Sequence, residues 1–119
     1  MKWTIKYYNE QVQEDILNLP DKLQARYLKL TDRMLIYGPN LGEPHTKPLK
    51  DGLFEIRMKA KEGIARALYC TIKRNEIHIL HVFMKKTQKT PSKELKTARK
   101  RLKEIKENDD TQTIKRKNA

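Results

Sequence analysis

The chain has 119 residues, including 27 Lys and Arg against 15 Asp and Glu, and its formal net charge at pH 7 is +12. This length predicts a single domain with one modest core, and the charge favours a polyanionic partner: RNA, DNA, the ribosome or an acidic protein. The single cysteine, Cys70, excludes a framework of internal disulfides. Because no apolar run has the length of a signal peptide or a membrane span, we expect a cytoplasmic protein without a membrane partner.

The first half of the chain predicts a strand, two helices and a loop. Apolar and polar residues alternate over 3–7, which is typical of a strand with one buried face. Asn9 is placed to cap a short helix, and a second helix is expected at 21–37 before Gly38. The apolar positions expected to face the sheet are Val12, Ile16, Leu17 and Leu19 in the first helix and Leu23, Tyr27, Leu28, Leu30, Met34 and Leu35 in the second. Prolines in 39–48 argue against a helix or a central strand, so an ordered loop or a lid is expected there.

The second half predicts three strands. Alternating or apolar runs at 53–59, 64–72 and 76–83 are separated by turn-forming residues, the pattern of an antiparallel meander. Together with the helix pair, this order of elements predicts an α+β fold with a small, mostly antiparallel sheet.

The C-terminal part predicts a basic helix followed by a tail. Thr90 and Pro91 are typical of an N-cap and a first helical position, and the helix is expected to run to about Asn108. Its charges are interpreted as a solvated face, with contact to phosphate as the alternative. The polar residues 109–119 lack periodicity, so we expect one domain at 1–108 and a flexible tail after it.

Cationic residues at the ends of the strands are the strongest chemical signal. A ribonuclease that forms a cyclic phosphate has to stabilise the phosphorane charge and move protons at two oxygens. Arginine offers planar donors to phosphate oxygens, and a lysine crowded by cations exchanges its proton nearer neutrality. The candidate catalytic residues are Arg57, Arg66, Lys85 and Lys86, and the residues expected to contact RNA are Phe83, Tyr69, Lys47, Lys50, Lys89 and Arg99. The alternative is that Arg57 and Arg66 are ordinary solvated strand residues.

The histidines and the cysteine give weaker signals. His78 and His81 are three residues apart in a predicted strand, which places them on opposite faces and argues against a two-histidine mechanism. His45, in the proline-rich loop, is a candidate for proton transfer, with a plain polar loop residue as the alternative. Cys70 lies in an apolar run and is interpreted as a small buried hydrophobe rather than a nucleophile.

Several spaced motifs resemble one known family. They lie at 49–57, 65–69 and 83–91 and are followed by Glu94 and Arg99. In this order they resemble the HigB-type toxins of the RelE/ParE superfamily, in particular the phage-derived Gp49-like branch. The resemblance implies a RelE-like fold and a type II toxin that cleaves messenger RNA on translating ribosomes, without a metal or any other cofactor.

The same resemblance implies roles and partners. Arg57 and Arg66 would hold the scissile phosphate, and Lys85 or Lys86 would take the basic position after the last strand. No tyrosine follows Tyr69, so the general acid stays unassigned. The implied partners are a helix-turn-helix, HigA-like antitoxin and messenger RNA on the ribosome.

Two other functions are compatible with such a fold. One is a ParE-like, gyrase-poisoning toxin, and the cationic set of Arg57, Arg66 and Lys85 argues against it. The other is a basic RNA- or DNA-binding module without catalysis. In such a module, neutralising Arg66 would change affinity in proportion to charge and abolish no reaction.

Overall fold

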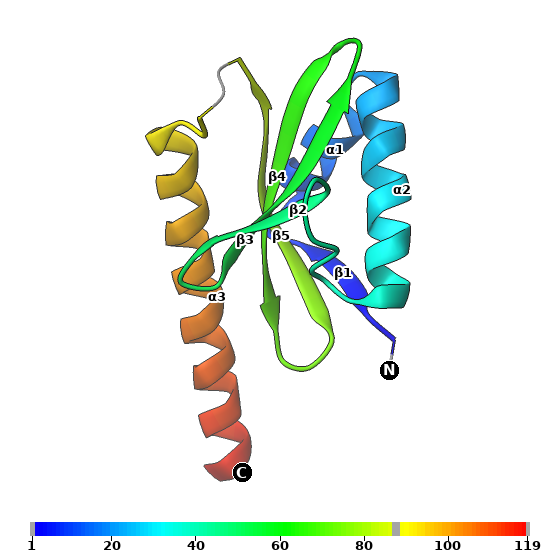
Figure 1. Ribbon diagram of the computed structural model, residues 1–119. Coiled ribbons are helices and arrows are strands. Elements are labelled where there is room, and N and C mark those ends of the chain that lie inside the picture. The colour runs from blue at the N-terminus through cyan, green and yellow to red at the C-terminus, as the bar shows by residue number, and fades with distance from the viewer. Residues whose placement is uncertain (1, 87–88, 119) are drawn as a thin grey trace.

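The computed structural model describes residues 2–86 and 89–118 and shows a five-stranded sheet between a helix pair and one long helix (Figure 1). The elements are β1 (Thr4–Tyr7), α1 (Glu10–Leu17), α2 (Asp21–Tyr37), β2 (Thr46–Lys50), β3 (Leu53–Ala60), β4 (Gly63–Ile72), β5 (Glu76–Lys85) and α3 (Ser92–Asn118). In the sheet order β1-β5-β4-β3-β2, β1 runs parallel to β5 and the other neighbours are antiparallel. The predicted α+β fold is therefore confirmed. Within the described part of the chain, no helix combines the length and apolar character that a bilayer span requires.

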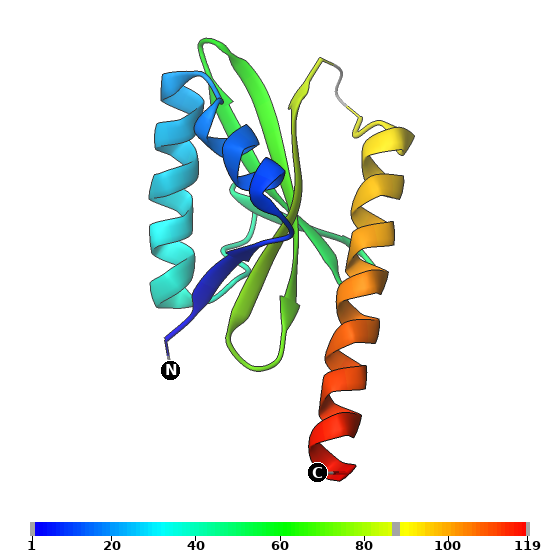
Figure 2. The same ribbon diagram turned by 180° about the vertical axis from the view of Figure 1, so that it is seen from behind.

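The helices α1 and α2 cover one face of the sheet, as predicted (Figure 2). Asn9 caps α1, because its Oδ1 accepts a hydrogen bond from the Val12 amide at 2.9 Å. Leu17 and Leu28, two predicted core residues, are instead 61% and 54% exposed. Each directly follows a buried residue, and a helix turns by about 100° per residue, so the next side chain leaves the narrow buried stripe.

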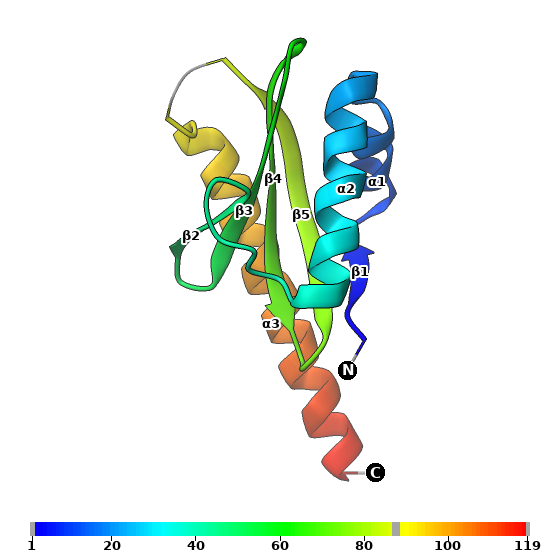
Figure 3. The same ribbon diagram turned by 45° about the vertical axis from the view of Figure 1, so that its right-hand side comes forward.

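The helix α3 covers the opposite face over a smaller core (Figure 3). Its Ala98 and Leu102 belong to one buried cluster with Leu53, Leu68 and Leu80 of the sheet. This single helix closes the side of the sheet that α1 and α2 leave open, so both faces of the central strands are covered along part of their length.

The bounds of α3 differ from the prediction at both ends. The Pro91 carbonyl accepts a hydrogen bond from the Leu95 amide at 3.2 Å, so Pro91 precedes the helix, and the Thr90 hydroxyl bonds to Glu55 rather than capping. The predicted end near Asn108 is wrong, since the helix continues to Asn118. No glycine or proline follows Pro91 to stop it. The domain boundary at 108 and the flexible tail after it stay predictions.

The segment predicted as a loop contains the beginning of a strand. Thr46–Lys50 forms β2 at the edge of the sheet, where it pairs with β3 alone. Pro48 is tolerated there because an edge strand has one side on which no amide has to donate to a neighbour. The rest of the segment, 39–45, connects α2 to the sheet as expected.

The two histidines of β5 lie on the same face, and the prediction of opposite faces is wrong. Leu68 is paired with His81 and the next residue, Tyr69, with Ile79, so Leu80 is an extra residue in β5. This β-bulge shifts the alternation of side chains by one position. His78 and His81 both point to the α3 side as a result, which a count of residues along a regular strand does not reveal.

Candidate active site

Three neighbouring strands place most of the candidate catalytic residues on one face. Residues directly opposite each other in paired strands share a face, and the registers of β3, β4 and β5 define three rows across the α3 side of the sheet. We call this surface the cationic rows. The first row contains Lys59, Ile64 and Lys85, the second contains Arg57, Arg66 and Phe83, and the third contains Glu55, Leu68 and His81.

Arg66 is the centre of the cationic rows. It is only 5% exposed, and its Nη1 donates to the Ala65 carbonyl at 3.2 Å. Burial lowers the pKa of Arg66, an effect that Glu55 opposes and Arg57 reinforces. Its Nε has no hydrogen-bond partner among the described residues. The alternative of an ordinary solvated strand residue is therefore wrong for Arg66.

Glu55 holds the two arginines together. Its Oε1 lies 3.7 Å from Arg57 Nε, and its Oε2 lies 3.5 Å from Arg66 Nε. The carboxylate is buried, and Thr90 Oγ1 donates to Oε2 at 3.4 Å. A buried carboxylate between two guanidinium groups fixes their position on the sheet and leaves their other donors for an anion.

Lys85 is electrostatically part of the same cluster. Burial lowers the pKa of Lys85, the positive charges of Arg66, Arg57 and Lys47 lower it further, and Glu55 opposes the shift. Lys47 is opposite Glu55 in the pairing of β2 with β3, so it shares this face. A lysine with a depressed pKa gives up its proton more readily than a solvated one.

An aromatic pair lies beside the arginines. Phe83 is opposite Arg66 and stacks on His81 with ring centroids 5.7 Å apart. His81 Nε2 is 3.0 Å from Glu94 Oε2 in the first turn of α3. Phe83 thus offers a partly buried ring next to the arginines, and the imidazole behind it is held by a carboxylate.

Tyr69, a predicted RNA contact, lies on the wrong face. It is fully buried on the side of α1 and α2, where its ring stacks on Phe54 and its hydroxyl donates to the Pro39 carbonyl at 2.5 Å. Burial raises the pKa of Tyr69. A base has no access to this ring, so the prediction that Tyr69 stacks on RNA is wrong.

Other predicted contacts are spread around the cationic rows. Arg99 Nη1 donates to the Lys50 carbonyl at 3.3 Å and lies 3.9 Å from Asp51 Oδ2. Both predicted residues therefore lie at the turn between β2 and β3, away from Arg66. Lys86 directly follows β5 and is exposed, as is Lys89. Their roles stay predictions.

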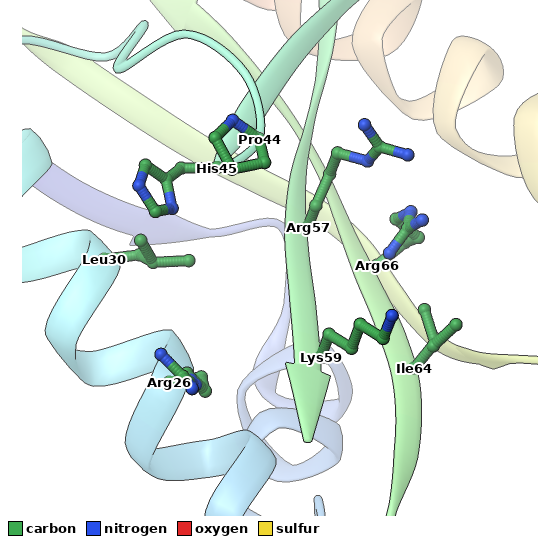
Figure 4. A pocket seen from close by; sticks show the side chains of 8 residues that line it. All are labelled: Arg26, Leu30, Pro44, His45, Arg57, Lys59, Ile64 and Arg66. Carbon is green, nitrogen blue, oxygen red and sulfur yellow. The ribbon is translucent and has the colours of Figure 1, made fainter. Parts of the chain in front are cut away.

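His45 lies apart from the three rows. It lies with Arg26, Leu30 and Pro44 on the α2 side of β3, whereas Arg57 lies on the other side of that strand (Figure 4). The cavity that these residues line extends across β3 and is also lined by Arg57 and Arg66. Proton transfer by His45 stays a prediction.

Two further kinds of chemistry find no support among the described residues. Burial raises the pKa of the Cys70 thiol to about 11, which fits a buried hydrophobe. In the segments that the structure describes, no three His, Cys, Asp or Glu side chains are grouped as a metal site requires.

Sequence reasoning missed three residues of this site: Glu55, His81 and Glu94. Glu55 was detectable, since it precedes Arg57 by two residues and a strand alternates with period two. The position of His81 depends on the bulge at Leu80, for which the sequence gives no signal.

Comparisons with known proteins agree with this architecture. A family model described as "Phage derived protein Gp49-like (DUF891)" matches residues 14–103. A chain of the archaeal RelE–RelB complex from Pyrococcus horikoshii OT3 is similar in structure, with a TM-score of 0.53 and 22% identity over 71% of this chain and 96% of that chain. A chain of the YoeB–YefM complex from Staphylococcus aureus has a TM-score of 0.53 and 20% identity over 72% of this chain and 100% of that chain. No curated protein sequence gives a significant match.

Proposed function

Because the chain belongs to the phage-derived Gp49-like family and has the fold of the RelE and YoeB complexes, we propose that it is the toxin of a type II toxin–antitoxin system. We further propose that it cleaves messenger RNA on translating ribosomes without a metal ion. The observation that carries the proposal is Arg66, a cation held on the sheet face by Glu55 and flanked by Arg57 and Lys85.

The cationic rows suit the chemistry of phosphodiester cleavage. Arg57 and Arg66 would donate to the nonbridging oxygens, on which charge builds up as the 2′-hydroxyl attacks phosphorus and releases its proton to water. Glu55 would hold both guanidinium groups in place. Lys85, whose pKa is lowered, would protonate the leaving 5′-oxygen. It would thus act as the general acid in a chain that has no tyrosine after Tyr69. Phe83 would stack on a base next to the scissile bond.

The antitoxin belongs to the same proposal. The RelE and YoeB structures are complexes with RelB and YefM, and an exposed cationic surface is a suitable target for an acidic segment of such a partner. We propose a helix-turn-helix, HigA-like antitoxin that blocks RNA cleavage. A candidate antitoxin added at equimolar concentration should abolish cleavage, and undiminished cleavage in the fully formed complex would contradict this part.

The test is cleavage of messenger RNA on translating ribosomes by Arg57→Gln and Lys85→Gln, compared at equal ribosome occupancy. Lys100→Gln, an exposed position on α3, is the matched control. Loss of one transition-state donor should lower the cleavage rate by about 100- to 1,000-fold, and the control should cleave normally. In a second assay, with a free RNA that the chain cleaves as the substrate, excess EDTA should leave the cleavage rate unchanged.

Three results would contradict the proposal. Intact messages at full ribosome occupancy would refute nuclease activity, and DNA breaks that depend on gyrase would then favour the ParE-like alternative. A loss of RNA affinity in proportion to the charge removed, with no RNA cleavage by the wild type or the variants, would favour a basic binding module. Inhibition of cleavage by EDTA would refute metal independence.

A further inference from the structure

A second basic surface adjoins the cationic rows across the free edge of β3. The pairing of β2 with β3 ends at Ile56, and one more hydrogen bond joins the Arg57 amide to the His45 carbonyl at 2.8 Å. From Met58 to Ala60 no other strand of the described chain pairs with this edge. Free backbone donors and acceptors therefore lie next to the arginines.

A cavity of about 540 Å³ extends over this edge. On one side of β3, Arg26 and Leu30 of α2 meet Pro44 and His45 of the connecting loop (Figure 4). On the other side it is lined by residues of the cationic rows: Arg57, Lys59, Ile64 and Arg66. The cavity thus combines apolar and ring side chains with cations, and it reaches the arginines.

A second cavity of about 440 Å³ continues this surface along α2. The two cavities share Arg26, and the second adds Lys22, Lys29 and Lys61. Among the side chains that the structure describes, no carboxylate lines either of them. We call the two cavities together the α2 groove. A groove lined by charges of one sign concentrates the opposite charge within it.

We propose that the α2 groove binds the RNA next to the scissile phosphate, with one nucleobase in the larger cavity and the following phosphates on Arg26 and Lys29. This inference rests on the proposed action on RNA. The base would lie against Leu30, Pro44 and His45, which gives His45 a stacking role. The free edge of β3 would supply hydrogen bonds to the base.

The mixture of lining residues favours RNA over an acidic peptide. A carboxylate-rich segment needs only the cations, whereas a nucleotide presents a flat ring and a phosphate side by side. The larger cavity has both kinds of lining, and Arg57 and Arg66 are among the residues that line it. An RNA strand lying in it would reach the cationic rows without a break.

The test measures binding of a single-stranded RNA that carries a 2′-deoxy nucleotide at the cleavage position and so stays intact. Fluorescence anisotropy across a salt series compares the wild type with Arg26→Gln and Lys29→Gln, both at exposed helix positions. Lys96→Gln on α3, also exposed, is the matched control. Each groove variant should bind about tenfold more weakly at low salt and lower the salt slope by about 0.7, and the control should bind like the wild type.

An abasic scan tests the base pocket separately. Removing the base at one particular position of the RNA should weaken binding to the wild type by about tenfold. The same removal should have little effect on His45→Ala, because that variant has already lost the stacking surface. Thermal unfolding of each variant verifies that the fold is retained.

The outcomes separate this inference from the proposed function. Equal RNA affinity for Arg26→Gln and Lys96→Gln would overturn the inference even if the wild type cleaves RNA. Binding that depends on Arg26 without any cleavage would support the groove and contradict the nuclease. Binding of poly-glutamate that depends on Arg26, together with RNA binding that does not, would overturn the inference in favour of an acidic protein partner.

Discussion

Replacing Glu55 by glutamine should destabilise the protein more than any other single loss of charge in the cationic rows. The carboxylate is 4% exposed and lies 3.5 Å from Arg66 Nε, where the arginine side chain is itself 6% exposed. In Glu55→Gln the guanidinium of Arg66 stays buried without a counter-charge. The opposite substitution, at Arg66, would leave the carboxylate with Arg57 alone.

The magnitude follows from the burial of each pair. Breaking a buried ion pair by removing one partner costs about 3–5 kcal/mol. The Arg57 side chain is 33% exposed, so solvent screens that pair and its loss adds about 1 kcal/mol or less. Since glutamine still accepts a hydrogen bond, we expect about 3 kcal/mol in total. For a domain of this size that lowers Tm by about 10–15 °C.

The assay is urea unfolding followed by circular dichroism, with Glu62→Gln in the exposed β3–β4 turn as the matched control. The control should change the free energy of unfolding by less than about 0.5 kcal/mol. A double-mutant cycle with Arg66→Met should give a coupling energy of at least about 1.5 kcal/mol. A cost below about 1 kcal/mol for Glu55→Gln, or additive effects in the cycle, would refute the reasoning.

Three other substitutions test separate parts of the structure. The lowered pKa of Lys85 means that this lysine loses its proton at a lower pH than a solvated lysine, so cleavage should fall as the pH rises through that pKa. In Lys85→Arg the side chain stays protonated throughout the accessible pH range, so this basic limb should vanish from the pH–rate profile. An unchanged limb would assign it to another group. Between the lowered pKa of Lys85 in the folded protein and the ordinary lysine pKa in the unfolded chain, the unfolded chain binds more protons than the folded one. The contribution of Lys85 to folding stability should therefore rise with pH over this window in the wild type and stay constant in Lys85→Arg. Phe83→Leu should weaken binding of uncleavable RNA by about tenfold, as loss of a stacking ring does, and an equal affinity in anisotropy titrations would show that the ring contacts no base. Tyr69→Phe should cost about 1–2 kcal/mol in urea unfolding, because the partly buried Pro39 carbonyl loses its donor, while RNA affinity stays unchanged; lower affinity would contradict the burial of Tyr69.

The parts of the fold that depend on local chemistry were predictable from the sequence. The Asn9 cap and the bounds of α2 at 21–37 follow from neighbouring residues, and the structure reproduces both. The strand β2 depends on a partner, because Thr46–Lys50 becomes a strand only where β3 offers an edge. The continuation of α3 to Asn118 was missed because the absence of a periodic apolar stripe was interpreted as the absence of a helix.

The candidate site was predictable where strand alternation is regular. Arg57, Arg66 and Lys85 lie together on the α3 side. The same alternation argues against Tyr69, since it follows Arg66 by three residues and an odd step changes the face. The bulge at Leu80 breaks this rule in β5, and only the paired strand shows where the extra residue lies.

The cationic rows lie on three strands that are consecutive in the chain, and two short turns connect them. Their geometry is therefore specified within one continuous stretch, and the helices supply support rather than alignment. Changes in α1, in the exposed face of α2 or in the length of α3 can accumulate without moving Arg57 relative to Arg66. Evolution can therefore keep these three strands while the surfaces that contact other macromolecules diverge. This accounts for a shared architecture at 20–22% identity.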